Sequence, residues 1–104
     1  MSMTRVYHGI TFDSNKIADF CRRHGVVKLS LFGSILRDDF GPESDVDVLV
    51  EFGPEGTPSL FDLGGMLVEL TEMFGRQADL KTWGFISDRI RPQIERERQV
   101  QYAA

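Results

Sequence analysis

The sequence Leu31-Phe-Gly-Ser-Ile-Leu-Arg-Asp-Asp-Phe-Gly-Pro-Glu-Ser-Asp-Val-Asp-Val-Leu-Val-Glu-Phe52 decides the fold of this 104-residue chain. Its first apolar run stops at Gly33-Ser34, and a polar connection leads to a valine-rich segment that contains Asp45 and Asp47. Valine favours strands, whereas aspartate is depleted in them. Because side chains alternate between the two faces of a strand, both aspartates project to one side and the valines to the other. We therefore predict a strand that carries two neighbouring carboxylates.

The paired carboxylates predict a cation site. Like charges a few ångströms apart repel, which raises the pKa of one of them. A divalent cation such as Mg²⁺ removes this repulsion, because it binds carboxylate oxygens and keeps positions open for water and phosphate. The alternative is a solvated strand face with two acidic residues, and the short motif alone does not exclude it.

The Gly33-Ser34 turn upstream is suited to phosphate. Glycine permits close backbone approach, and main-chain N–H groups at such a strand-to-helix turn form an anion-binding concavity. We expect a brief helix from Ser34 to about Asp38, capped by Ser34 itself, with its N-terminus facing the same phosphates. Asp38 and Asp39 are expected to face solvent.

Taken together, Gly33-Ser34, Arg37 and the segment Ser44-Asp45-Val46-Asp47 resemble the signature of the DNA polymerase beta-type nucleotidyltransferase superfamily. The chain is most similar to the small stand-alone branch, the minimal nucleotidyltransferases, over nearly its whole length. The resemblance implies an α+β fold of the polymerase beta-like type, with a small mixed β-sheet of three or four strands flanked by helices.

The resemblance also implies roles for individual residues. In the family, the Gly-Ser pair holds a nucleoside triphosphate, and the two strand aspartates bind the magnesium ions that accompany it. Asp45 and Asp47 are thus expected to be metal ligands. The residues expected to bind the nucleotide are Gly33, Ser34, Arg37 and Ser44. Whether Arg37 touches phosphate or braces the loop through Asp45 or Glu43 is open at this point.

A third carboxylate is expected at Asp79. The segment from Arg76 to Thr82 predicts a short strand, and Asp79 lies on the face opposite its apolar neighbours. The superfamily places its third acid on a strand beside the Asp-x-Asp strand, where it helps to hold the catalytic metal and draws the proton from the attacking hydroxyl. A surface aspartate beside Lys81 is the alternative. The competing acids, all on predicted helices, are Asp62, Glu69 and Asp88.

The rest of the chain alternates between helices, strands and loops. We predict a helix from Asp13-Ser14 to Gly25, a strand over Val26–Phe32, a breaker-rich loop beside the site over Gly53–Pro58, a helix from Ser59 to Gly75, and a last helix from Ser87 or Asp88. Gly64-Gly65 falls in mid-helix, where close approach to the sheet, a partner chain or mere tolerance would explain it. Pro92 predicts a kink or two pieces in the last helix.

Length and composition indicate one globular domain over residues 1–104. The chain is 41% hydrophobic and 27% charged, which is ordinary for a soluble domain. No apolar run approaches the roughly 20 residues that span a bilayer, and the N-terminus lacks a secretory signal, so we expect a cytoplasmic protein without membrane contact. A net charge of −4 argues against direct nucleic-acid binding. Cys21, the single cysteine, is expected to be a buried apolar residue.

The expected chemistry is attack of an acceptor hydroxyl on the α-phosphate of ATP, the co-substrate, with Mg²⁺ as cofactor. Minimal nucleotidyltransferases typically act beside a HEPN-domain ribonuclease toxin. The resemblance therefore implies an antitoxin that transfers AMP to a tyrosine of such a partner. A second hypothesis is an antitoxin that inhibits its partner by steric binding without catalysis. A third is nucleotidyl transfer to a small molecule or an RNA end, which small size and acidic charge disfavour.

Overall fold

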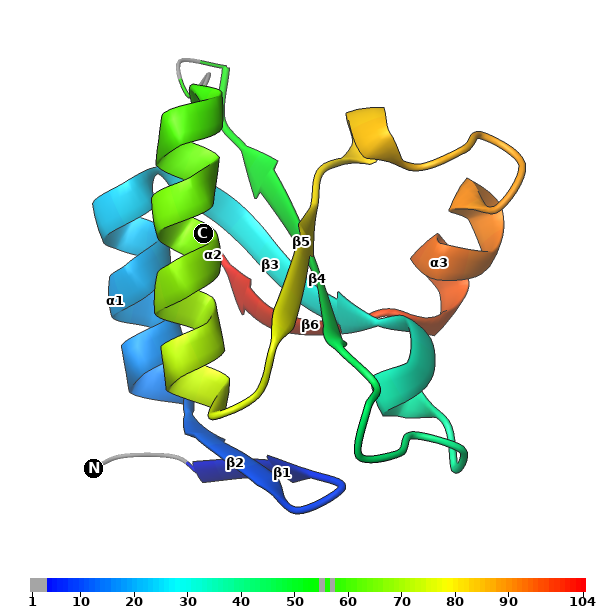
Figure 1. Cartoon of the computed structure of the whole chain (residues 1–104). Helices are drawn as coiled ribbons and strands as arrows, with labels where there is room; N and C mark the ends of the chain where they lie inside the picture. Colours follow the sequence, from blue (N-terminus) through cyan, green and yellow to red (C-terminus); the bar gives the residue numbers. More distant parts are fainter. Residues whose placement is uncertain (1–3, 55, 57) are drawn as a thin grey trace.

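The computed structural model describes residues 4–54, 56 and 58–104, which form a four-stranded sheet, a separate hairpin and three α-helices (Figure 1). In chain order the elements are β1 (Thr4–Tyr7), β2 (Ile10–Asp13), α1 (Ser14–His24), β3 (Val26–Phe32), the 3-10 helix η1 (Gly33–Leu36), β4 (Val46–Phe52), α2 (Leu60–Phe74), β5 (Ala78–Lys81), the 3-10 helix η2 (Trp83–Phe85), α3 (Arg91–Glu97) and β6 (Gln99–Ala103).

The main sheet is mixed, with the strand order β5-β4-β3-β6. Strand β3 pairs antiparallel with both β4 and β6, whereas β4 and β5 run parallel. A parallel pair needs a long crossover connection, and α2 supplies it. The predicted α+β class with a small mixed sheet is confirmed.

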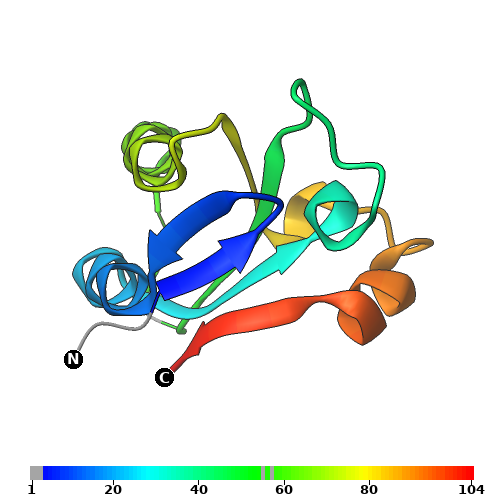
Figure 2. The same ribbon diagram turned by 90° about the horizontal axis from the view of Figure 1, so that it is seen from below.

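The two long helices, α1 and α2, lie side by side against one face of the sheet (Figures 1 and 2). The alternation in β4 follows the prediction, since its valines are buried in this core while Asp47 is half-buried on the opposite face. Cys21 is also buried, and burial raises the pKa of its thiol to about 12. The core residues include Ile17, Phe20, Leu29, Leu31, Val46, Val48, Val50, Met66 and Leu70.

The ends of both long helices were predicted correctly. Asp13 caps α1 by accepting a hydrogen bond of 2.8 Å from the Asn15 N–H, and Gly25 follows the last turn. Ser59 and Asp62 form a reciprocal capping box at the start of α2. Gly64 and Gly65 do not mark close packing within the chain, because a Cβ at either position would meet nothing within 4 Å. Of the three explanations considered, close approach to the sheet is therefore excluded, and a partner chain or mere tolerance remains.

Two paired segments were not predicted as strands. The hairpin β1–β2 turns at His8 and Gly9, whose φ values of 51° and 79° suit the tight turn of a two-residue hairpin. Strand β6 forms the edge of the main sheet beside β3. Its charged surroundings hid its strand character, and Val100 is 44% exposed.

Two further expectations need correction. The last helix begins only at Arg91, so Pro92 lies in the first turn, where its missing N–H is not required and no kink arises. The breaker-rich loop after β4 does not lie beside the site: Gly53 and Gly56 are near Val27 and Gly25, at the opposite end of the sheet from Asp47. Glu55 and Thr57 of this loop lie outside the described residues.

A smaller apolar cluster covers part of the other sheet face and attaches α3 to it. Its buried members are Phe32, Leu49, Ile86 and Ile94. Beside it, the Glu51 carboxylate accepts hydrogen bonds from the Trp83 indole N–H (2.9 Å) and from Arg98 Nη1 (2.8 Å). Burial alone would raise the pKa of Glu51, but these two hydrogen bonds and the positive charges of Arg98 and Lys28 lower it overall.

The substitution Glu51→Ala should lower the free energy of unfolding by about 1–3 kcal/mol, because it leaves the Trp83 N–H and the Arg98 guanidinium without their acceptor. The matched control is Glu95→Ala, whose ion pair with Arg91 is exposed and should change stability by less than about 0.5 kcal/mol. Urea denaturation measures both, and equal losses would contradict this assignment.

Candidate active site

The site forms where β3 ends and β4 begins. Phe32 is the register partner of Asp47, so the Gly33 turn that follows Phe32 lies directly beside that carboxylate. Gly33 has a φ of 75°, and a Cβ built on it would lie 2.3 Å from Asp47 Oδ2. The backbone N–H of Ser34 donates a hydrogen bond to Asp47. Only glycine allows both the backbone conformation and this approach of the carboxylate.

The helix after the turn differs from the prediction. Helix η1 begins at Gly33, its N-cap position is Phe32, and no side chain caps it. Ser34 does not cap the helix because it already lies within it. Its half-buried hydroxyl makes no hydrogen bond to any other described residue. Asp38 and Asp39 are exposed, as expected.

The structure brings Asp47 and Asp79 together on neighbouring strands. Asp79 lies on β5 as the direct register partner of Asp47, which is the position expected for the third acid. Asp45 immediately precedes β4 and is exposed. No three His, Cys, Asp or Glu side chains in the described part of the chain form a ready-made metal cage. The structure thus brings Asp47 and Asp79 together as a pair, and Asp45 lies just before the first residue of β4.

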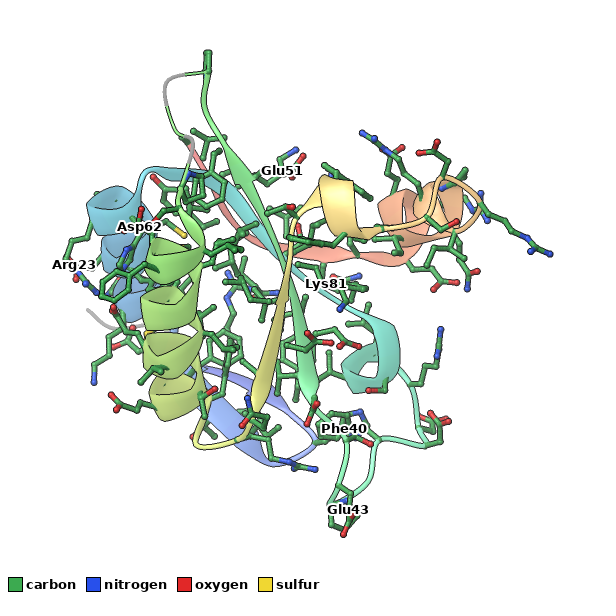
Figure 3. The ribbon with its side chains drawn as sticks, turned by 45° about the horizontal axis from the view of Figure 1, so that its top comes forward. Arg23, Phe40, Glu43, Glu51, Asp62 and Lys81 are labelled. Carbon is green, nitrogen blue, oxygen red and sulfur yellow. The ribbon has the colours of Figure 1, made fainter. Side chains whose placement is uncertain are left out.

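Asp47 is the electrostatic centre of the site. Its pKa is raised, first by burial and then by the negative charge of Asp79, with a smaller contribution from Asp45. Lys81 opposes these effects, and its Nζ lies 3.2 Å from Asp79 Oδ2. Figure 3 shows Lys81 on the side of β5 that faces η1. Lys81 therefore acts on Asp47 and Asp79, and together with Asp45 the site retains an excess of negative charge.

The two other expected nucleotide-binding residues have different surroundings. Ser44 closes a turn, because its Oγ accepts a hydrogen bond of 3.0 Å from the Gly41 N–H and its own N–H donates to the Gly41 carbonyl. Arg37 is exposed beside Gly33 and makes no ion pair with any residue that the structure describes. Glu43 lies at the loop tip (Figure 3), so bracing of the loop through Glu43 is not observed.

The loop that leads to Asp45 is held by residues that sequence reasoning missed. The Arg76 guanidinium donates to the Gly41 carbonyl and lies 4.8 Å from the centre of the Phe40 ring. His8, at the hairpin turn, stacks on the Phe40 ring, and the centres of the two rings lie 5.0 Å apart. No sequence pattern connects these three segments, and only the fold brings them together.

Comparison with known proteins identifies the family. Residues 14–101 match the nucleotidyltransferase domain family. The chain belongs to this family. A Methanocaldococcus jannaschii relative, provisionally named a protein adenylyltransferase, is 40% identical over 82 residues, which cover 79% of this chain and 86% of the relative.

Solved structures place the chain among the minimal nucleotidyltransferases. One structure, provisionally assigned to a minimal nucleotidyltransferase, is 30% identical, has a TM-score of 0.68, and is matched over 83% of this chain and 86% of that one. A second is a complex of a tri-AMPylated Shewanella oneidensis HEPN toxin with its MNT antitoxin. It matches with a TM-score of 0.63 over 88% of this chain and 70% of that one. The sequence identity is 18%, so the similarity concerns the fold alone.

The substitution Asp47→Asn should raise the melting temperature by a few degrees at pH 7 without divalent cations. A carboxyl group whose pKa is raised by folding destabilises the folded state once it ionises, so the neutral amide removes a cost. The difference between variant and parent should be largest above the folded pKa and should vanish at pH values below the unfolded pKa. Thermal unfolding in EDTA measures it, with the exposed Asp38→Asn as control. A pH-independent loss of stability would refute the assignment.

The substitution Gly33→Ala should displace the Asp47 carboxylate and abolish nucleotidyl transfer. Gly25→Ala is the matched control, since its φ is 72° and its Cβ would meet nothing within 4 Å. Both variants should lose about 1–2 kcal/mol of stability from backbone strain. Only Gly33→Ala should shift the Asp47 carboxyl resonance in ¹³C NMR. The close contact would be disproved by an unchanged resonance and activity.

Proposed function

We propose that this minimal nucleotidyltransferase is a Mg²⁺-dependent protein adenylyltransferase that moves AMP from ATP to a tyrosine of a HEPN-type toxin and thereby acts as its antitoxin. The observation that carries the proposal is the Asp47–Asp79 pair beside the Gly33-Ser34 turn. The name of the M. jannaschii relative supports a protein acceptor, and the AMPylated HEPN toxin bound to a protein of the same fold supports the partner.

The carboxylates suit a magnesium ion. Hard oxygen donors are the ligands that Mg²⁺ prefers, and the pKa of Asp47 is raised first by burial and then by the negative charge of Asp79, which a cation would offset. Asp45, Asp47 and Asp79 would hold the ion. When bound, Mg²⁺ neutralises charge on the triphosphate and polarises the reacting phosphoryl group.

The turn suits the triphosphate. The Ser34 hydroxyl supplies a donor, Gly33 lets a phosphate approach the backbone closely, and Arg37 supplies a positive charge beside them. Ser44 contributes by holding the loop, since its hydroxyl is already engaged by Gly41. Phosphate contacts are thus assigned to Gly33, Ser34 and Arg37 in this proposal.

In the reaction, the phenol oxygen of the acceptor attacks the α-phosphorus of ATP, the bond from this phosphorus to the bridging oxygen breaks, and pyrophosphate leaves. Asp79 accepts the phenol proton, and Lys81 must release one oxygen of Asp79 for this purpose.

The described residues include no helix able to span a membrane. We further propose that residues 1–104 form one domain of a cytoplasmic protein and that this domain does not bind nucleic acid, in line with its net charge of −4.

A steric antitoxin is the second candidate. It is favoured by the engagement of Asp79 with Lys81 and by the lack of a ready-made three-acid cage in residues 4–54, 56 and 58–104. Such a protein would bind its partner equally well without the carboxylates.

Intact-mass spectrometry of the partner toxin, incubated with this protein, ATP and Mg²⁺, separates the two candidates. We expect one or more AMP units on the toxin, no gain with Asp45→Asn/Asp47→Asn, and full gain with the exposed control pair Asp38→Asn/Asp39→Asn. Protection of cells by the Asp45→Asn/Asp47→Asn variant, with a stable complex and no AMP on the toxin, would establish the steric antitoxin instead.

A further inference from the structure

A pocket of about 220 Å³ lies between the phosphate turn and α3. Its apolar floor comes from Phe32 and Ile94, which are each 8% exposed, and Ile90 forms a wall that is 47% exposed. Neither the three carboxylates nor Ser34 line it. The pocket is therefore separate from the reacting centre.

The pocket is continuous with the phosphate turn through Gly33 and Arg37, which both line it. Gly33 lines the pocket and also borders Asp47 on the side where a Cβ would lie. A molecule whose phosphates lie on this turn therefore has its other end within reach of the pocket. Figure 1 shows η1 and α3 as neighbours on the face of the sheet that α1 and α2 do not cover.

The polar lining of the pocket consists of Arg37, which is assigned to the phosphates, and of Gln93 and Glu97 on α3. Gln93 Nε2 donates to the Glu97 carboxylate at 3.3 Å. This hydrogen bond uses a Gln93 donor and leaves the Gln93 amide oxygen and the Glu97 carboxylate as acceptors. An apolar floor with hydrogen-bond acceptors at its edge suits a flat aromatic ring that carries an amino group.

The wall that carries these acceptors is fixed in place. Helix α3 is attached to the sheet through Ile94 in the apolar cluster, and Arg98, at its C-terminal end, is hydrogen-bonded to Glu51. Acceptors on an anchored element lose little freedom when they bind a ligand, which favours selection between similar rings.

From these observations we infer that the pocket binds the nucleobase of the donor nucleotide, and that Gln93 and Glu97 select adenine through its 6-amino group. This inference rests on the proposed function, because it requires the triphosphate to bind at Gly33-Ser34. A tyrosine ring of the acceptor fits less well, because a phenol offers a single hydroxyl donor to two acceptors. The 6-oxo purines place an acceptor where adenine offers its amino donor, so we expect them to bind less tightly.

The test compares the affinities of ATP, ITP and inorganic tripolyphosphate, measured by calorimetry in Mg²⁺. ITP has an oxo acceptor where ATP has the 6-amino donor, and it carries a proton on N1, where ATP has an acceptor. Wild-type protein should bind ATP about tenfold more tightly than ITP. The double variant Gln93→Ala/Glu97→Ala should bring the ratio close to one with ITP affinity unchanged, and Glu95→Ala, elsewhere on α3, should leave the ratio intact.

A second variant tests the pocket without its polar rim. Ile90→Trp should obstruct the pocket, weaken ATP about tenfold or more, and leave tripolyphosphate affinity unchanged. If the protein binds tripolyphosphate but neither variant changes the affinity for ATP, the nucleobase pocket is overturned and the proposed function still stands. Failure of the wild-type protein to bind ATP and tripolyphosphate would instead overturn the phosphate turn on which both proposals depend. GTP or ITP binding as tight as ATP would overturn the selection of adenine.

Discussion

The approach of the Asp47 carboxylate to the backbone of Gly33 is the constraint on which the rest of the site depends. It requires a strand that carries an acid, a neighbouring strand that ends in the same register, and a residue without a side chain at a φ of 75°. Pairing of Phe32 with Asp47 satisfies the first two conditions, and Gly33 satisfies the third. Once this contact exists, the Ser34 N–H donates to the same carboxylate, and the phosphate turn and the acid pair become a single unit.

The two faces of the sheet have different roles: one contains the main core, and the other carries the reacting groups. The face covered by α1 and α2 contains the main core, so the acids on the opposite face raise the energy of the fold without disrupting its packing. On that opposite face, the Glu51–Trp83–Arg98 group and the small cluster around Leu49 hold α3 in position. The same sheet thereby supports a charged reacting centre and an apolar pocket next to it.

Local signals in the sequence predicted the parts of the fold that local physics controls. Asp13, Ser59 and the glycines after both long helices define their ends, and the alternation around Asp47 defines the faces of β4. The signals failed where long-range pairing decides, as in β6 and the first hairpin, and where Pro92 starts a helix that was expected to contain it. The acids at Asp47 and Asp79 follow from alternation, whereas Lys81 beside Asp79 and Arg76 beneath the loop depend on contacts that only the assembled sheet creates.

The central claim is that the acids around Asp47 form a cation site adjoining the phosphate turn. Paramagnetic broadening by Mn²⁺, used in place of Mg²⁺ with a non-hydrolysable ATP analogue and ¹⁵N-labelled protein, tests it most directly. The account predicts that the earliest loss of amide signals occurs at Gly33, Ser34, Asp47 and Asp79. Broadening that begins at the acidic residues of α2, such as Glu69 and Glu72, with the Gly33 and Asp47 signals unaffected, would contradict it.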